Sequence, residues 1–337
     1  MKRHFIKFMA GLLAALMVAS LSGCAGGASK NDGKSTSGSN SGSGWPKKTL
    51  TIVVPFSAGG DTDFHARLYA KYLGKILGQS VVVTNVAGSN GTSGATQVKN
   101  STADGYTALF FHDSMLMNKV VGVSDYDHTA FDICCGGVVD NSFILAVNAN
   151  SPYKNLKDFI NAAKEKPGQL KYASSVGGYT YYIGRELEKL TGAKFNIVDA
   201  GGGSDRNAAL LAKKIDSNCN PYGVMKPYVE AKNFKVLCVF SDKRSDLYPD
   251  VPTAKEQGYD LIAKRVYFLA FPKGTDSAII KKMNDAMKQI SGMPEYKSAI
   301  EKSYCLEPAF MDTQETKTYL DNEMADFMKE KSFITGK

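Results

Sequence analysis

Runs of apolar residues that suit buried strands alternate along the chain with segments whose apolar residues recur every three or four positions. The first run, 49–55 (TLTIVVP), is rich in β-branched residues and predicts a buried strand. Apolar residues at helical spacing follow over 64–76, and Gly78 is a typical residue for the end of that helix. A second strand is predicted at 80–84, so residues 49–84 form a strand–helix–strand unit.

The same layout recurs later, most clearly over 170–198, where a glycine pair again separates a strand from a helix. Further strands are predicted at 106–111, 142–147, 170–174, 194–198 and 236–240, and further helices at 155–164, 179–190, 204–214, 276–290 and 313–329. A short helix is expected after 88–94, and the chain is expected to cross back near 264–271. This alternation indicates the α/β class with mainly parallel sheets.

The amino-terminal end has a different pattern. Three basic residues precede the apolar run 8–21, which is too short to span a bilayer comfortably. The run ends in Leu-Ser-Gly-Cys, which resembles the lipobox of bacterial lipoproteins, where Cys24 becomes the lipidated first residue of the mature chain. We therefore expect a lipoprotein signal peptide over 1–23, with a plain secretory signal as the alternative. The Gly/Ser-rich tract 24–44 cannot bury apolar surface and is predicted to be a flexible tether.

The length of the chain indicates the number of domains, and its charge indicates which kinds of ligand to expect. The folded part is expected to start near Trp45, which leaves about 290 residues, enough for two domains. The chain carries 41 basic and 33 acidic residues, a formal net charge of +8. Because no basic run is interleaved with aromatic residues, nucleic acid is not expected as a partner. The positive excess suits an anionic ligand, or simply solvated lysine faces.

The remaining cysteines do not form a recognisable site. Five follow Cys24 in the sequence: Cys134, Cys135, Cys219, Cys238 and Cys305. Their odd number and the lack of CxxC spacing argue against a disulfide framework and against a zinc site. We predict that they are small buried apolar residues.

Glycine-rich loops are the candidate ligand-binding features. They follow predicted strands and open predicted helices at 57–61, 88–94, 174–180 and 201–204. In open α/β sheets, ligands bind at this end of the strands, where free N–H groups and the helix dipole favour an anion. Two such loops facing each other would form a two-sided anion site that needs no charged side chain, although ordinary strand–helix turns are the alternative. Asp61 or Thr62 is predicted to cap the first helix, and Thr275 the helix 276–290.

Catalytic and cofactor motifs are missing from the sequence. It contains no HExxH and no GxSxG, and the loop 88–94 lacks the Lys-Ser/Thr of a phosphate loop. His65 lies in a predicted helix and is expected to be a structural residue with its hydrogen bonds satisfied. His112 and Ser114 follow a strand at its carboxyl end and are predicted to form a pocket wall. Asp63 is expected either to pair with Arg67 across one helical turn or to face the ligand. No cofactor and no metal are expected.

Several longer blocks together resemble one family. TLTIVVPFSAGGDTDFHAR, NVAGSNGTSGATQV and ADGYTALFF are similar to the amino-terminal blocks of the TctC/Bug family, the extracytoplasmic solute receptors of tripartite tricarboxylate transporters. KPGQLKYASSVGGYT is similar to the start of that family's second domain, and RSDLYPDVPTAKEQGYD to another of its blocks. The resemblance covers roughly residues 46–330.

The resemblance implies a fold and a set of binding residues. The fold is a two-lobed, venus-flytrap fold of the type II periplasmic-binding-protein class, with a mainly parallel central sheet in each lobe. Lobe one would comprise 46–146 and 264–337, and lobe two 147–263. Both lobes would offer backbone amides to a carboxylate, through Phe56, Ser57, Ala58, Gly59, Gly60 and Asp63 on one side and Ser174, Ser175, Gly177, Gly178 and Thr180 on the other. Gly202 and Tyr222 lie in segments that depart from the family pattern and are expected to contact the distal end of the ligand.

The function expected from these features is non-enzymatic. A monomeric binding lipoprotein, lipid-anchored at the outer face of the cell membrane, would capture a small carboxylate, such as a di- or tricarboxylate. It would deliver this ligand to a permease of one large and one small membrane subunit. The alternatives are an α/β enzyme that acts on a phosphorylated small molecule, and a receptor of the same fold that presents its ligand to a sensor.

Overall fold

The computed structural model of the protein describes residues 44–175 and 177–336. The predicted signal peptide, Cys24 and almost all of the predicted tether lie outside the described residues. Within the described part of the chain, no helix is both long enough and apolar enough to cross a membrane.

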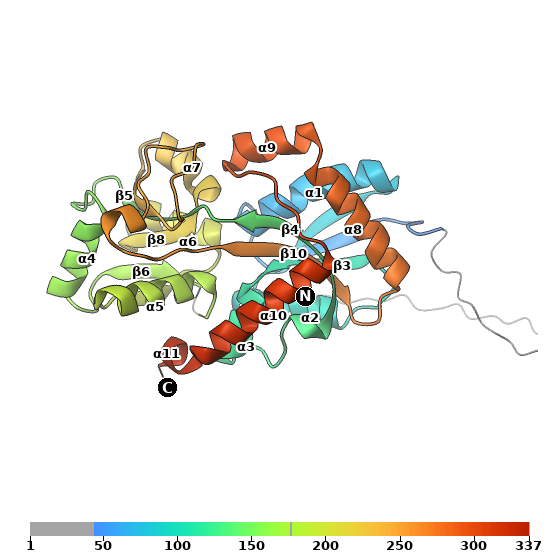
Figure 1. The fold of residues 1–337 in the computed structure, drawn as a ribbon, viewed down its shortest axis with the longest axis horizontal. Coiled ribbons are helices and arrows are strands. Elements are labelled where there is room, and N and C mark those ends of the chain that lie inside the picture. Colours follow the sequence, from blue (N-terminus) through green and yellow to red (C-terminus); the bar gives the residue numbers. More distant parts are fainter. Residues whose placement is uncertain (1–43, 176, 337) are drawn as a thin grey trace, which may run out of the picture. The chain divides into compact units, whose positions relative to one another are not determined.

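Two five-stranded sheets organise the described residues (Figure 1). The first has the strand order β2-β1-β3-β10-β4 and the second β7-β6-β8-β5-β9. The strands are β1 (Leu50–Val54), β2 (Val81–Asn85), β3 (Thr107–His112), β4 (Phe131–Asp140), β5 (Phe143–Asn148), β6 (Lys171–Ser174), β7 (Asn196–Asp199), β8 (Ser217–Pro221), β9 (Phe234–Val239) and β10 (Arg265–Pro272).

Each sheet contains one reversed strand. In the first sheet β1 pairs in parallel with β2 and β3, whereas β10 is antiparallel to both β3 and β4. In the second, β6 pairs in parallel with β7 and β8, whereas β5 is antiparallel to β8 and β9. Four strands of each sheet therefore share one direction, which confirms the predicted α/β class with mainly parallel sheets.

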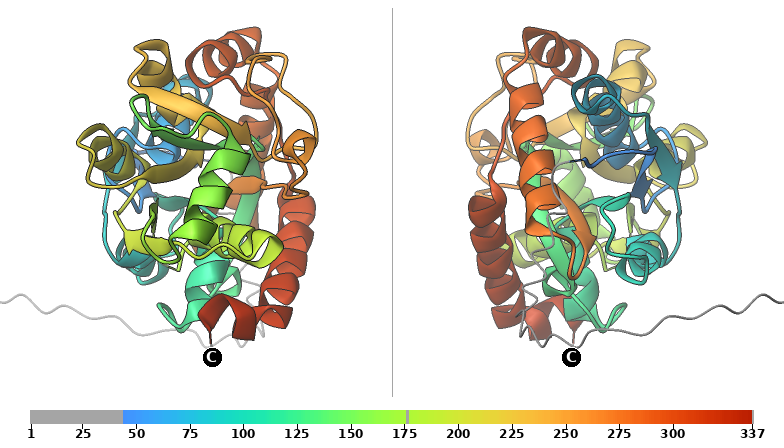
Figure 2. Two further views of the ribbon diagram at one scale, coloured as in Figure 1. Left: turned by 90° about the vertical axis from the view of Figure 1, so that its left-hand side faces the viewer. Right: turned by 90° about the vertical axis from the view of Figure 1, so that its right-hand side faces the viewer.

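Helices cover both faces of both sheets (Figures 1 and 2). They are α1 (Asp61–Leu77), α2 (Thr92–Lys99), α3 (Ser114–Val121), α4 (Leu156–Glu165), α5 (Tyr179–Thr191), α6 (Gly203–Leu211), α7 (Tyr222–Glu230), α8 (Ser277–Ser291), α9 (Pro294–Tyr304), α10 (Thr313–Lys329) and α11 (Lys331–Thr335). Residues of β1 alternate between the two faces: Leu50, Ile52 and Val54 pack with α1, α8 and α9, whereas Val53 belongs to the core that includes α2, α3 and α10. The period of two is the one expected for a strand buried on both sides.

The chain passes between the sheets at two neighbouring places. It leaves the first sheet after Asp140 and enters the second at Phe143, and it returns at Arg265. Arg265 and Asp140 are paired in register on β10 and β4, so the two crossings lie side by side. The chain therefore passes from the first sheet to the second before residue 146, which was predicted to end the first part of lobe one. The limits of the lobes themselves stay a prediction.

Some local predictions were wrong. The amino-terminal cap of α1 is Gly60, so neither Asp61 nor Thr62 caps this helix, and the cap of α8 is Asp276 instead of Thr275. The strands β4 and β8 and the helices α3, α7, α9 and α11 were not predicted. β8 has the sequence SNCNP, and its polar residues are buried in a hydrogen-bonded network, so no apolar pattern marks it as a strand. Gly78 ends α1 in the left-handed conformation, as predicted.

The cysteines are confirmed as buried residues without disulfide bonds. All five in the described part of the chain are free and buried. No cluster of three or more potential metal ligands is found among the described residues.

Candidate ligand-binding site

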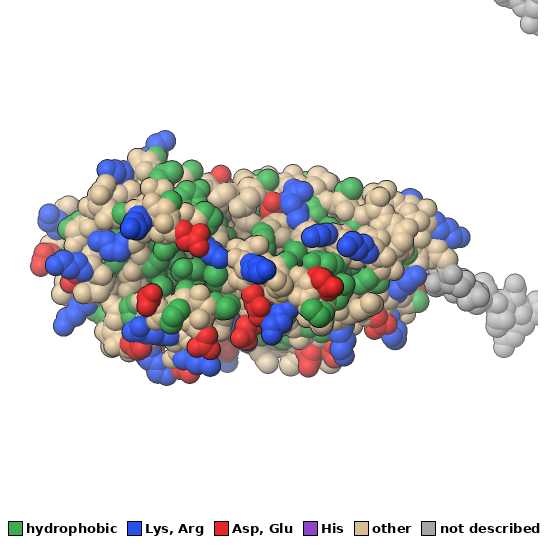
Figure 3. Space-filling model, turned by 90° about the horizontal axis from the view of Figure 1, so that it is seen from above, with side chains coloured by type: hydrophobic (Ala, Val, Ile, Leu, Met, Phe, Trp, Pro, Cys, Tyr) green, Lys and Arg blue, Asp and Glu red, His purple; other side chains and the backbone are tan. Residues whose placement is uncertain are grey.

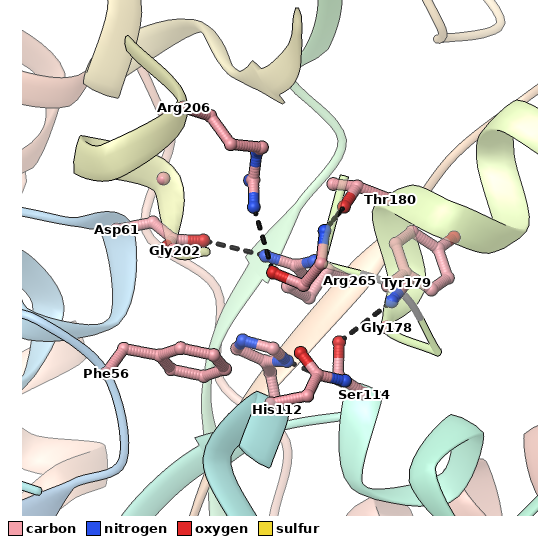
Figure 4. Close-up of a pocket in the computed structure, with 13 residues that line it drawn as sticks. Phe56, Asp61, His112, Ser114, Gly178, Tyr179, Thr180, Gly202, Arg206 and Arg265 are labelled. Carbon is pink, nitrogen blue, oxygen red and sulfur yellow. Dashed lines mark hydrogen bonds and ion pairs between the residues drawn. The ribbon is translucent and has the colours of Figure 1, made fainter. Parts of the chain in front are cut away.

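A small polar cavity, called here the inner cavity, lies where loops that follow strands of both sheets meet (Figure 4). Its lining residues are Phe56, Asp61, Asn90, His112, Ser114, Ser175, Gly178, Tyr179, Thr180, Gly202, Gly203, Arg206 and Arg265. Its volume is about 20 Å³, and a water molecule needs about 10–15 Å³ of such space. The inner cavity therefore has room for a water molecule or the head of a small ligand, but not for a whole organic acid.

Arg206 brings a buried positive charge to the inner cavity from the first turn and a half of α6. Arg206 is 4% exposed. Its guanidinium donates to Ser175 Oγ at 3.1 Å and to the Gly201 carbonyl at 2.8 Å. It also donates to the side-chain oxygens of Asn218 and Asn220. All of these acceptors are neutral. Among the described residues no carboxylate lies within ion-pair distance of it, and burial lowers the pKa of Arg206 below its ordinary value.

A buried cation with only neutral partners is unusual, since burial of a charge is costly unless an opposite charge accompanies it. Asn218 and Asn220 are held in turn by Asn207 and by the Gly203 carbonyl. The polar residues of β8 therefore form a frame that fixes the guanidinium toward the inner cavity. An anionic ligand would supply the missing counter-charge.

Arg265, the second arginine of the inner cavity, already has a counter-ion. Its Nη1 lies 2.7 Å from Asp61 Oδ2, and that oxygen also accepts from the Tyr267 hydroxyl at 2.7 Å. Burial opposes ionisation of Asp61, but the charge of Arg265 and the hydrogen bond from Tyr267 hold the pKa of this carboxyl below its ordinary range. The ion pair is therefore formed, and the Arg265 guanidinium also packs over the rings of Phe143 and Tyr179.

Two further carboxyl groups lie next to Arg265. Burial raises the pKa of Asp113 to about 7, against the opposing charge of Arg265, whose Nε lies 3.8 Å from Asp113 Oδ1. Burial likewise raises the pKa of Asp140 to about 6, although Ser142 donates to it from its backbone and its hydroxyl. Both carboxyls therefore keep their protons to a higher pH than an exposed aspartate does.

His112 is a neutral wall of the inner cavity. Its ring stacks on Phe56 with 5.2 Å between centroids and an interplanar angle of 10°, and its Nδ1 accepts from the Ser114 backbone N–H at 3.2 Å. Burial, assisted by the charge of Arg265, lowers the pKa of His112 well below its ordinary value. With Nδ1 as the acceptor, the proton of the neutral ring resides on Nε2, which makes this nitrogen a donor.

The start of α5 closes the inner cavity from the second sheet. The Tyr179 backbone N–H donates to Ser114 Oγ at 3.0 Å, and Thr180 Oγ1 accepts from the Ser175 N–H at 3.3 Å. A Cβ on Gly178 would lie 3.0 Å from both side-chain polar atoms of Asn90, which belongs to the first sheet's loops. The absence of a side chain at Gly178 therefore allows the two sets of loops to approach closely.

A second cavity, the outer cavity, adjoins the first. It has a volume of about 210 Å³ and is lined by Phe56, Ser57, Ala87, Gly88, Ser89, Asn90, Gly91, Ser175, Asp199, Gly201, Gly202 and Asp205. Phe56, Asn90, Ser175 and Gly202 line both cavities. Loops from both sheets thus line a larger space beside the inner cavity.

The structure brings about half of the predicted site residues together. The inner cavity is lined by Phe56, His112, Ser114, Ser175, Gly178, Thr180 and Gly202, and the outer cavity additionally by Ser57. Neither cavity is lined by Ala58, Gly59, Gly60, Asp63, Ser174, Gly177 or Tyr222. Tyr222 instead stacks on Tyr248 at 4.0 Å, and a Cβ on Gly177 would lie 2.7 Å from Val121.

Asp63 and His65 also have structural surroundings. Asp63 forms an ion pair with Arg67 at 2.9 Å and accepts hydrogen bonds from the Gly59 N–H and from Asn85. Of the two alternatives, pairing with Arg67 or facing the ligand, the structure shows the first. His65 is fully buried, as a structural residue would be, but neither ring nitrogen has a hydrogen-bond partner in the described structure. The expectation that its hydrogen bonds are satisfied was therefore wrong, and burial lowers its pKa to about 3.

The charged residues of the inner cavity were not predicted. Asp61 was interpreted as a helix cap. Arg206 and Arg265 belong to no recognisable sequence motif, because the segments around them have the patterns of an ordinary helix and an ordinary strand. The available indication was that the loops 57–61, 88–94 and 201–204, which contribute Asp61, Asn90 and Gly203, were recognised as candidate ligand loops. The inner cavity thus contains charged side chains, which the expected anion site did not require.

One face of the molecule carries side chains of both charges. On the face seen in Figure 3, Lys and Arg side chains are spread out and Asp and Glu side chains lie among them.

Comparison with known proteins identifies the family. The family model described as tripartite tricarboxylate transporter family receptor (TctC) matches residues 65–335. A Cupriavidus necator protein described as UPF0065 protein in gbd 5'region is 31% identical over 291 residues, 86% of this chain and 88% of its own. The protein BugT of Bordetella pertussis is 31% identical over 247 residues, 71% of this chain and 75% of its own.

A solved structure agrees with the fold. The structure of an R. palustris protein with adipate superimposes with a TM-score of 0.82 at 25% identity and covers 87% of this chain and 99% of its own. The expected two-lobed periplasmic-binding-protein fold is thus confirmed, and the enzyme alternative is not supported. The chain belongs to the tripartite tricarboxylate transporter receptor (TctC) family, whose members are substrate-binding receptors and not enzymes.

Proposed function

We propose that this protein is an extracytoplasmic receptor that binds the carboxylate group of a small organic acid at Arg206 and delivers the acid to a tripartite tricarboxylate transporter. The observation that carries the proposal is the buried Arg206 guanidinium, which lines the inner cavity and has only neutral partners among the described residues. The family membership and the adipate named for the R. palustris structure support the same ligand chemistry.

The carboxylate would be held from both lobes. Arg206 and the start of α5 belong to the proposed second lobe, 147–263, whereas His112 belongs to the proposed first lobe, 46–146 with 264–337. Arg206 would supply the charge, and His112 would donate from Nε2. Because the inner cavity is smaller than an organic acid, the lobes would move apart for entry and close around the head group of the ligand.

The proposed location is supported by the amino-terminal sequence motif, and the proposed partners by the family membership. Cys24 would carry a lipid that anchors the receptor at the outer face of the cell membrane, and the Gly/Ser-rich tether would let it reach the permease. The receptor would act as a monomer that meets one large and one small membrane subunit. The lipobox-like sequence before Cys24 and the composition of the tether support this arrangement.

The test is the exchange of Arg206 for glutamine. In calorimetry against a panel of mono-, di- and tricarboxylates, we expect R206Q to bind at least tenfold to hundredfold more weakly, because charge-assisted hydrogen bonds contribute about 1.5–3 kcal/mol each. R206Q removes the buried charge but also the four hydrogen bonds of the guanidinium, so circular dichroism and thermal unfolding serve as the folding control.

The matched control is R244Q. Arg244 lies in the same part of the chain but is exposed, outside both cavities, and pairs with Glu256. R244Q is expected to bind like the wild type. Wild-type affinity in a folded R206Q protein, or a wild type that binds no carboxylate of the panel, would contradict the proposal.

A further inference from the structure

The outer cavity is where the distal end of a bound carboxylate would lie. Because Phe56, Asn90, Ser175 and Gly202 line both cavities, the space beyond the head-group site is the outer cavity. The outer cavity, at about 210 Å³, is about ten times larger than the inner cavity. If the carboxylate of a ligand is bound at Arg206, the rest of the ligand would therefore extend into the outer cavity.

The two cavities carry opposite charges. Arg206 lines the inner cavity, whereas the preceding residue, Asp205, lines the outer cavity together with Asp199. No Lys, Arg or His is found among the described residues that line the outer cavity. The chain thus places a cation at one end of the ligand path and two acidic side chains at the other.

The two acidic side chains are held in place by neutral groups. Asp199 accepts from the Gly201 N–H at 3.0 Å, and Asp205 accepts from the Gly202 N–H at 3.0 Å and from Ser57 Oγ at 3.4 Å. In the described part of the chain, neither forms an ion pair with a basic residue. Both carboxyl groups are therefore positioned without being neutralised.

Two buried groups of the neighbouring inner cavity support a ligand beside the acidic pair. Arg206, 4% exposed, has no acidic partner, and Arg265, 3% exposed, has a buried Nε without a hydrogen-bond acceptor in the described structure. Both side chains line the inner cavity. Asp199 and Asp205 are themselves exposed, but they line the outer cavity, which shares four lining residues with the inner cavity that holds the two arginines.

We propose that Asp199 and Asp205 determine the specificity of this receptor by selecting a carboxylate whose distal end carries an ammonium group, and by disfavouring di- and tricarboxylates. This inference rests on the proposed function, since it requires a carboxylate at Arg206. A distal ammonium would gain the attraction of two carboxylates that lack basic partners. A distal carboxylate would meet two like charges in a partly enclosed space.

The experiment compares ligands of equal length that differ only at the distal end. Calorimetry of the purified full chain would use 4-aminobutyrate, succinate and butyrate, and then the series 5-aminopentanoate, glutarate and pentanoate. We expect the amino acid of a series to bind at least about tenfold more tightly than the dicarboxylate, with the monocarboxylate between them.

Variants connect this preference to the two acidic residues. D199N/D205N keeps an oxygen that can accept from Gly201 and Gly202 but removes both charges, and we expect it to lose the preference for the amino acid. D250N/D260N removes the same charge from exposed positions of the second sheet's loops outside both cavities, and is expected to keep the preference.

Each outcome decides between the two proposals. Succinate and glutarate that bind as tightly as the amino acids, or a preference that survives in D199N/D205N, would overturn this inference and leave carboxylate binding at Arg206 intact. A wild type that binds none of the six probes would also overturn it, whereas the wider carboxylate panel with R206Q decides the proposed function separately.

Discussion

Two arginines of the same cavity show how the surroundings of a residue decide its role. Arg265 and Arg206 are 3% and 4% exposed, and both line the inner cavity. Arg265 is neutralised by Asp61, so its charge is used within the protein. Arg206 has hydrogen bonds to neutral groups only, so its charge remains available to a ligand.

Asp113 gives a prediction for the effect of pH on stability. Its folded-state pKa is raised to about 7, mainly by burial, so the folded protein holds the proton more tightly than the unfolded chain does. The stability that the neutral carboxyl contributes is therefore fully present below about pH 4 and is lost as the pH rises through about 7. In D113N the side chain stays neutral, so this loss is absent.

Urea unfolding of wild type and D113N at pH 4.5, 6 and 8 tests this prediction. The free energy of unfolding of the wild type relative to D113N should fall by about 3 kcal/mol between pH 4.5 and pH 8. Asp140 titrates in both proteins, so its contribution cancels in the comparison. A difference that is constant from pH 4.5 to pH 8 would show that Asp113 does not have a raised pKa.

At the scale of elements, the amino-terminal ends of α5 and α6 form the part of the site that belongs to the second sheet. Both helices have a glycine cap with extended backbone, Gly178 and Gly202, and neither cap has a side chain that competes for the free N–H groups of the helix. These two short, bare caps allow the loops of the first sheet to come close, as the contact between Gly178 and Asn90 shows.

Replacing Gly178 with alanine should keep the lobes from closing fully. Its φ of −97° suits any residue, so the variant is expected to fold, but the added Cβ would lie 3.0 Å from Asn90 and 3.1 Å from the Ser175 carbonyl. Overpacking of this kind costs about 1–3 kcal/mol, so carboxylate binding should weaken by about fivefold to a hundredfold.

Gly292→Ala is the control for this change. Gly292 also has an ordinary φ, −88°, and its added Cβ would meet only the Gln289 carbonyl, at 3.7 Å. Calorimetry with the best-binding carboxylate of the panel compares the two variants. Equal affinities for G178A and G292A would mean that the contact between Gly178 and Asn90 does not limit binding.

The sequence predicted elements better than it predicted the chemistry of the cavity. Strands such as β1 and β6 and the helix ends at Gly78 and Gly192 follow from local patterns, because apolar periodicity and left-handed glycines are local properties. Arg206 could not be identified in this way. Its role depends on the frame provided by β8, a buried polar strand whose pairing with β5 and β6 is set by the whole sheet.

At the scale of the whole molecule, the carboxyl-terminal helices connect the elements of the two sheets. α10 packs on β4 and α3, and the following α11 lies against α5, as Figures 1 and 2 show. The hydroxyl of Tyr181 donates to the Ile334 carbonyl, and Arg185 donates to the Phe333 carbonyl. The helix that contributes Gly178, Tyr179 and Thr180 to the inner cavity is thereby tied to the end of the chain.

The proposed anchoring can be tested on the whole protein. Cys24→Ser removes the only candidate for lipidation before the tether, so we expect the variant to leave the membrane fraction and appear in the soluble fraction. Its carboxylate affinity should equal that of the wild type, because the site lies within the described part of the chain. A C24S protein that still sediments wholly with membranes would contradict lipid anchoring through this residue.

The burial of the five free cysteines has a practical consequence for watching this receptor work. A thiol reacts with a maleimide as the thiolate, and burial raises the pKa of Cys219 to about 12 and that of Cys134 well above its ordinary value. Thiol-reactive dyes are therefore expected to leave the five native cysteines of the folded protein unlabelled. A single cysteine introduced on an exposed residue, in a C24S chain, would then take one label and report lobe closure by fluorescence.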